Sequence, residues 1–163
     1  MPCCLWTHTR LRRIGNAVKA VKNIIVPVGN ATLLSATYKA IAEMKESGSI
    51  NRTPHIIAVQ SDKCKPLVDA YSTGSAIKYR KPMTSADAIA VGYPTYGDQG
   101  IEAVLKTRGT AISVSEDSLR SEQKKFLKDY GLVAELASVS TLAAFDRLKP
   151  KGSTVAVITG SNV

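Results

Sequence analysis

Several short segments of this chain consist of consecutive apolar, mostly β-branched residues, and helix-like patterns separate them. We predict strands at 24–28 (IIVPV), 55–60 (HIIAVQ), 109–115 (GTAISVS) and 153–160 (STVAVITG), with a short one at 132–135 (LVAE). A strand that faces solvent on one side alternates apolar and polar residues, whereas these runs are continuous. The sequence therefore predicts a three-layer α/β/α fold, in which helices cover both faces of a mostly parallel sheet.

Apolar residues at helical spacing predict the two covering layers. We expect helices at 33–45, 64–71, 98–107, 116–130 and 138–149, and a short helix within 84–92. The helix at 116–130 has the clearest ends, because Ser115 is a favoured N-cap and Gly131 a favoured terminator. Asp62 is the expected N-cap of the helix at 64–71.

The 163 residues suffice for one domain with a full core, which we place at residues 24–163. Residues 1–23 lie outside the pattern and form a basic arm, with no acidic residue. The arm carries five of the 22 basic residues: Arg10, Arg12, Arg13, Lys19 and Lys22. The other 17 are interspersed with 13 acidic residues, and no nucleic-acid-binding signature appears, so the net charge of +9 does not predict a nucleic-acid partner.

Cysteine and histidine usage argues against a metal site. Cys3 and Cys4 are adjacent, Cys64 stands alone, and His8 and His55 have no partner at ligand spacing. No apolar run approaches the roughly 20 residues of a membrane helix, and the N-terminus lacks the pattern of a signal peptide. We therefore expect a cytoplasmic protein with no metal and no membrane partner.

The turn Gly29-Asn30-Ala31-Thr32 joins the first predicted strand to a helix. Free backbone N–H groups and the helix dipole favour an anion at such a place. Gly29 permits a close backbone approach, Asn30 tolerates a left-handed conformation, and Thr32 adds a hydroxyl donor. The spacing fits neither GxGxxG nor GxxxxGKS, and a tight turn without a ligand stays an alternative.

Six segments in collinear order resemble the C-terminal half of the threonine synthase family. They are VPVGNATLL, TPHIIAVQ, SADAIAVGYP, GTAISVSEDSL, GLVAELASVSTLAAF and STVAVITGSN, and the resemblance covers roughly residues 24–162. That family uses pyridoxal phosphate and shares its fold with the tryptophan synthase β chain and threonine deaminase. The resemblance implies this cofactor, and it implies the C-terminal part of the large domain of that fold.

The resemblance also implies roles for particular residues. Residues 29–32 correspond to the loop that holds the cofactor's phosphate. Thr159 corresponds to a hydroxyl that faces the pyridine nitrogen, and Glu135 corresponds to a Glu near the cofactor. Ala88 and Ile89 fall in the segment that passes the face of the ring. A hydroxyl leaves the ring nitrogen largely unprotonated, which suits elimination and replacement more than transamination. Ordinary strand-end roles stay open for Thr159 and Glu135.

The sequence departs from the family pattern at three places. Ala31 stands where the phosphate loop usually has glycine, and Leu136 stands where a proline follows the Glu. The Schiff-base lysine of the family lies upstream of the phosphate loop in a segment like Ser-Phe-Lys-Asp, and nothing before Gly29 matches it. Lys19 and Lys22 lie in a different pattern. We therefore expect that this chain alone does not catalyse threonine synthesis.

The function expected from the sequence is that of a truncated threonine-synthase-like domain that keeps a phosphate-binding turn. One alternative is a noncatalytic module that binds a phosphorylated metabolite, and another is one half of a split enzyme. The expected partners are a phosphate-bearing small molecule and a second copy of the chain, because half of a large domain leaves an open sheet edge and apolar patches.

Overall fold

The computed structural model describes residues 21–161, and the expectations for the first 20 residues, most of the basic arm, lie outside this range. Four parallel strands form one sheet in the order β3-β2-β1-β4. They are β1 (Asn23–Pro27), β2 (His55–Ser61), β3 (Thr110–Val114) and β4 (Thr154–Ala156). The predicted parallel sheet is confirmed, and β1 begins one residue earlier than expected.

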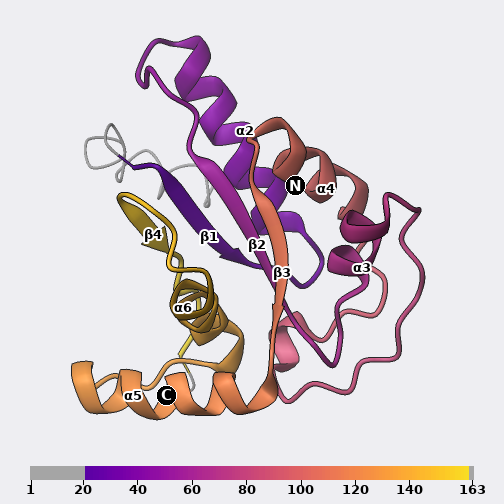
Figure 1. Cartoon of the computed structure of the whole chain (residues 1–163), viewed down its shortest axis with the longest axis vertical. Coiled ribbons are helices and arrows are strands. Elements are labelled where there is room, and N and C mark those ends of the chain that lie inside the picture. Colours follow the sequence, from indigo (N-terminus) through magenta and orange to yellow (C-terminus); the bar gives the residue numbers. More distant parts are fainter. Residues whose placement is uncertain (1–20, 162–163) are drawn as a thin grey trace.

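Helices cover both faces of the sheet, as predicted (Figure 1). The helices α2 (Thr32–Glu46), α3 (Pro66–Thr73) and α4 (Gly97–Lys106) pack on one face, and α5 (Glu116–Tyr130) and α6 (Leu136–Leu148) pack on the other. Within residues 21–161, one 3-10 turn, η1 (Asp87–Ile89), packs on the same face of the sheet as α5 and α6. No helix within residues 21–161 is long and apolar enough to cross a bilayer.

Two cores explain why the strand sequences are continuously apolar. In β1, Ile24 and Val26 pack into the core beneath α2, α3 and α4, whereas Ile25 packs into the core beneath α5 and α6. Side chains alternate between the faces of a strand, so a strand with a core on each face needs apolar residues throughout. All three of these residues are almost completely buried.

Three local expectations are wrong. Residues 132–135 form no strand, and they connect α5 to α6. The strand predicted at 153–160 is ordered as a strand only over Thr154–Ala156, because the chain beyond Val157 leaves the sheet and bonds to α6. Helix α3 has Lys65 rather than Asp62 as its N-cap, since Pro66 fits the first helical position.

The carboxyl ends of all four strands point to one edge of the sheet. Because the strands are parallel, the segments that follow them meet there: residues 28–31 after β1, 62–65 after β2, Ser115 after β3 and 157–161 after β4. Ligands of open parallel sheets bind at this edge. A ligand site is therefore expected among these four segments.

Candidate functional site

The turn after β1 leads directly into the first turn of α2. The Val28 N–H still donates to the Val59 carbonyl (2.8 Å), and the chain then leaves the sheet. Ala31 is the N-cap of α2 and has φ 63° and ψ 8°. The left-handed residue of the turn is thus Ala31, and not Asn30, the residue whose tolerance of that conformation the sequence suggested. Ala31 is 2% exposed, so its methyl group is part of the core.

A run of backbone donors at this turn has no partner in the described part of the chain. No acceptor within residues 21–161 bonds the N–H groups of residues 29–34, and Ala31 has no side chain that could cap the helix. The first carbonyl-paired amide is that of Ser35, which donates to Ala31 O (2.9 Å). Helix-start amides need water, a cap or an anion, and the helix dipole favours the anion. The turn therefore fits a phosphate group.

Two neighbouring segments fix the turn from outside. A Cβ placed on Gly29 would lie 2.6 Å from the carbonyl oxygen of Ala88, so only glycine allows η1 to approach this closely. Asn30 accepts hydrogen bonds from the segment before α4, with Oδ1 bonded to Thr95 N (2.7 Å) and its carbonyl to Tyr96 N (3.2 Å). The Asn30 side chain is thus used to hold the turn against α4.

Gln60 is a buried residue that sequence reasoning missed. Its Nε2 donates to the Val28 carbonyl (3.3 Å), and its Oε1 accepts from Leu67 N (2.9 Å) and Val68 N (3.2 Å). The side chain is completely buried and ties the end of β1 to the first turn of α3. A polar residue at the end of an otherwise apolar strand was the available signal.

Glu116, the first residue of α5, is a second residue that sequence reasoning missed. Its carboxylate accepts hydrogen bonds from Ser61 Oγ (2.7 Å), Thr84 Oγ1 (2.5 Å) and Ser85 N (2.9 Å). Burial by itself would raise the pKa of this carboxyl group, but the hydrogen bonds outweigh burial and lower the pKa below its ordinary value. Glu116 is therefore a charged group that joins three segments.

The structure brings Glu135 and Thr159 to the start of α6. Glu135 is the N-cap of α6, its N–H donates to Gly160 O (3.2 Å), and its carboxylate lies within 2.8 Å of the Cβ position of Gly160. Thr159 Oγ1 lies 3.5 Å from the Oγ of Ser138, a buried residue that also accepts from Thr159 N (3.2 Å) and Gly160 N (2.8 Å). Sequence reasoning missed Ser138.

Thr159 and the turn at residues 29–32 share one edge of the sheet. Thr159 follows β4, which pairs with β1, and Gly29 follows β1. No hydrogen bond between protein groups joins the turn to Thr159 or Glu135 in residues 21–161. The two parts of the candidate site are thus related through the sheet, and their roles toward a cofactor stay predictions.

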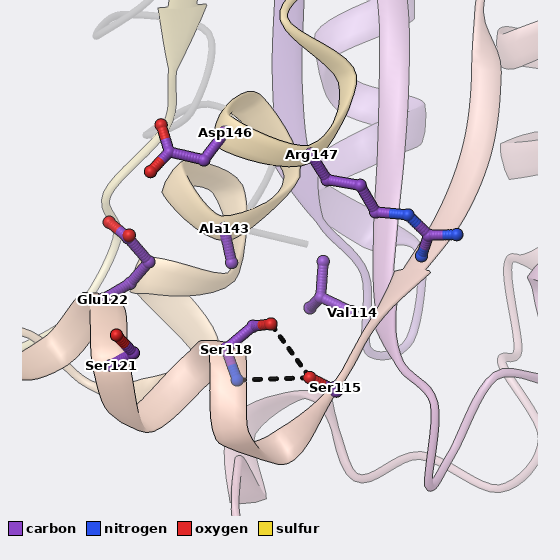
Figure 2. A pocket seen from close by; sticks show the side chains of 8 residues that line it. All are labelled: Val114, Ser115, Ser118, Ser121, Glu122, Ala143, Asp146 and Arg147. Carbon is purple, nitrogen blue, oxygen red and sulfur yellow. Dashed lines mark hydrogen bonds between the residues drawn. The ribbon is translucent and has the colours of Figure 1, made fainter.

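A hollow of about 440 Å³ between α5 and α6 is chemically different (Figure 2). Its wall carries the carboxylates of Glu122 and Asp146, and Lys125 bonds to both, at 3.5 and 3.0 Å. Burial, together with a hydrogen bond to Asp146, raises the pKa of Glu122. Two carboxylates and the Arg147 guanidinium line this hollow, whereas the turn after β1 offers a run of backbone N–H donors.

Solved structures with the same fold are pyridoxal-phosphate-type enzymes. An L-serine ammonia-lyase from the fungus Rhizomucor miehei superimposes with a TM-score of 0.80 and 18% identity, over 96% of this chain and 51% of that one. Maize serine racemase superimposes with a TM-score of 0.78 and 20% identity, over 96% and 47%. At these identities the likeness establishes the fold, which is that of the tryptophan synthase β-like enzymes.

Sequence comparison establishes the family. Residues 8–160 match the family described as "Pyridoxal-phosphate dependent enzyme", and this chain belongs to that family. Threonine synthase of Methanocaldococcus jannaschii is 33% identical over 131 residues, which are 79% of this chain and 32% of that protein. The catabolic L-threonine dehydratase TdcB of Escherichia coli K12 is 29% identical, over 88% of this chain and 43% of that protein.

The predicted resemblance to threonine synthases is confirmed. The prediction that the family depends on pyridoxal phosphate is also confirmed. The chain spans about a third of the length of the threonine synthases that it matches.

Proposed function

We propose that this chain holds pyridoxal phosphate by its phosphate group, as part of a threonine-synthase-like site. Gly29, Asn30, Ala31 and Thr32 form the phosphate turn, with backbone N–H groups as donors and the Thr32 hydroxyl as a further one. The observation that carries this proposal is the run of N–H groups at residues 29–34 that have no acceptor within residues 21–161, at the start of a 15-residue helix.

The bound cofactor supplies an electron sink for chemistry at the α-carbon of an amino acid. In our proposal Thr159 places its hydroxyl at the pyridine nitrogen, and Ser138 fixes that segment through its bonds to Thr159 N and Gly160 N. Glu135 borders the same segment and orients it through its N–H bond to Gly160 O. Ala88 and Ile89 border the ring, because they already pack on Gly29.

Replacement or elimination on a phosphorylated amino acid is the reaction class that we propose for the complete site. A neutral hydroxyl at the ring nitrogen favours these reactions over transamination. The threonine synthases among the relatives support a role in threonine biosynthesis. The substrate that we propose is O-phosphohomoserine.

We further propose that the chain by itself binds the cofactor without a covalent bond and does not catalyse threonine synthesis. The support for this proposal is in the sequence: Lys19 and Lys22, which precede the turn, lie in a pattern unlike the lysine-bearing Ser-Phe-Lys-Asp segment of the family. The test is to mix the purified protein with pyridoxal phosphate, reduce with borohydride and map labelled peptides. Specific labelling of one lysine together with turnover of O-phosphohomoserine would contradict the proposal.

Two alternatives have their own tests. A module that binds another phosphorylated metabolite would be stabilised by phosphate but not further by pyridoxal phosphate in a thermal-shift assay. Gly29→Val should remove both responses, because its side chain would collide with Ala88 O. Half of a split enzyme would gain mass and borohydride labelling only when a lysine-bearing partner chain is added. Apart from these, we propose that the chain self-associates as a dimer.

A further inference from the structure

Glu116 gathers three segments that are far apart in the sequence. Ser61 ends β2, Thr84 and Ser85 belong to the long segment between α3 and α4, and Glu116 begins α5. The Glu116 carboxylate accepts all three hydrogen bonds. It lies at the edge of the sheet where the strands end, and the phosphate turn lies at the same edge. The Arg120 guanidinium adds a second link from α5, by donating to Ser85 Oγ (2.8 Å).

The segment that Glu116 holds continues directly into η1. Ala86 N donates to Thr84 Oγ1 (3.1 Å), and Ile89 N donates to Ala86 O (3.1 Å). Ala86 is completely buried and Ile89 is 2% exposed, so this short piece is fixed on both sides. Hydrogen bonds thus connect the Glu116 carboxylate through Thr84 and Ala86 to Ile89.

The far end of that segment is in contact with the phosphate turn. The Cβ position of Gly29 lies 2.6 Å from Ala88 O, 3.3 Å from Ile89 Cα and 3.3 Å from a methyl group of Val91. Residues 88–91 thus form the wall against which Gly29 rests. Because Gly29 and this wall are in close contact, the position of the wall constrains the backbone at the start of the turn.

We propose that Glu116 is a positioning residue for the phosphate turn, which it controls through residues 84–91. This inference rests on the proposed function, because it gives the turn a ligand. Glu116 does not touch that ligand. Its charge is matched to three donors from two other segments, and that arrangement fixes the wall of the turn more firmly than a neutral side chain would.

The neighbouring Asp117 provides a matched control. It lies in the same first turn of α5 and carries the same charge, but no hydrogen bond joins its side chain to residues 84–91. Glu116→Gln keeps the shape of the side chain but removes its charge, so its bonds to Ser61, Thr84 and Ser85 are no longer charge-assisted. Asp117→Asn removes one negative charge from the same helix terminus and leaves the links intact.

The experiment measures two quantities on the full chain: the dissociation constant of pyridoxal phosphate by fluorescence titration, and amide hydrogen exchange of residues 28–34 and 84–91. We expect Glu116→Gln to weaken binding about tenfold, as the loss of one charge-assisted hydrogen bond predicts. Exchange in both segments should also accelerate about tenfold. Asp117→Asn should stay within about twofold of wild type in both. Arg120→Ala should fall between them, and it is the second variant if Glu116→Gln does not fold.

The outcomes separate the two proposals. If the wild-type chain does not bind pyridoxal phosphate, the proposed function fails, and exchange at residues 28–34 alone decides whether Glu116 positions the turn. If wild type binds and Glu116→Gln binds equally with unchanged exchange, the positioning role is wrong. Faster exchange throughout β2 and β3, without a selective effect at residues 28–34, would also overturn it, because that result indicates a general loss of stability.

Discussion

At the scale of single residues, Gly29 is the position in the turn that tolerates least change. Replacing it by alanine would place a methyl group 2.6 Å from the backbone oxygen of Ala88, and neither backbone can move without disturbing the other. We predict that Gly29→Ala lowers the free energy of unfolding by about 1–3 kcal/mol, the usual cost of overpacking. Urea unfolding followed by circular dichroism measures it, and an unchanged midpoint would contradict the close approach.

Ala31→Gly is the natural comparison, because it removes a methyl group from the same turn. Alanine in the left-handed conformation costs about 1–2 kcal/mol of stability, and glycine at this position removes that cost. Two effects of the substitution lower the free energy of unfolding. The loss of a buried methyl group costs about 0.8 kcal/mol, and the greater freedom of glycine in the unfolded chain costs about 0.5–1 kcal/mol. These effects oppose each other, so we predict a free energy of unfolding within about 1 kcal/mol of wild type. A loss as large as that of Gly29→Ala would be contrary to this balance.

Glu116 gives the folded protein a pH dependence of known sign. Its pKa is lower in the folded protein than in the unfolded chain, so its contribution is fully present above the unfolded value of about 4.3. That contribution is lost as the pH falls through the lowered pKa. The difference in unfolding free energy between wild type and Glu116→Gln should therefore be largest at neutral pH and shrink below about pH 4. Urea unfolding of both proteins at neutral pH and below about pH 4 measures this difference. A difference that grows in acid would contradict the lowered pKa of Glu116.

At the scale of elements, Ser138 connects α6 to the chain beyond β4. Its Oγ accepts from Thr159 N and Gly160 N, and these bonds end the strand early. We predict that Ser138→Ala costs about 1–3 kcal/mol, because two part-buried N–H groups lose their acceptor, and that the Thr159 and Gly160 amides then exchange faster with solvent. Ser121→Ala removes an exposed serine from α5 and should change neither quantity. Equal effects of the two variants would refute this role for Ser138.

The same elements show what the sequence could and could not predict. The continuous apolar runs of β1 and β2 correctly predict that both faces of these strands are buried. Ser115 and Gly131 correctly predict the two ends of α5, where they are the N-cap and the C-cap. The strand at 153–160 was predicted too long because its apolar pattern continues past the last sheet bond at Val157. Gln60, Glu116 and Ser138 were missed because their partners lie 7–55 residues away, and composition does not reveal such pairings.

At the scale of the whole molecule, the outer surface of α5 and α6 is the place where we expect two copies to meet. Phe126 and Tyr130 of α5 have ring centroids 4.9 Å apart, and they line an open groove with Leu142 and Phe145 of α6. Tyr130 is 67% exposed and Phe145 40% exposed. The same groove is also lined by four charged residues: Glu122, Lys125, Asp129 and Asp146. Exposed aromatic side chains are enriched in protein interfaces, where they carry much of the binding energy.

We therefore predict that Phe145→Asp raises the dissociation constant of the dimer at least about tenfold, because a carboxylate would replace an aromatic side chain in the proposed interface. Leu105→Asp is the matched control, since Leu105 is 60% exposed on α4 and lies on the opposite side of the sheet. It should leave the dimer unchanged. Sedimentation velocity over a range of protein concentrations measures both. A monomeric wild-type chain, or equal weakening by both variants, would show that this groove is not the dimer interface.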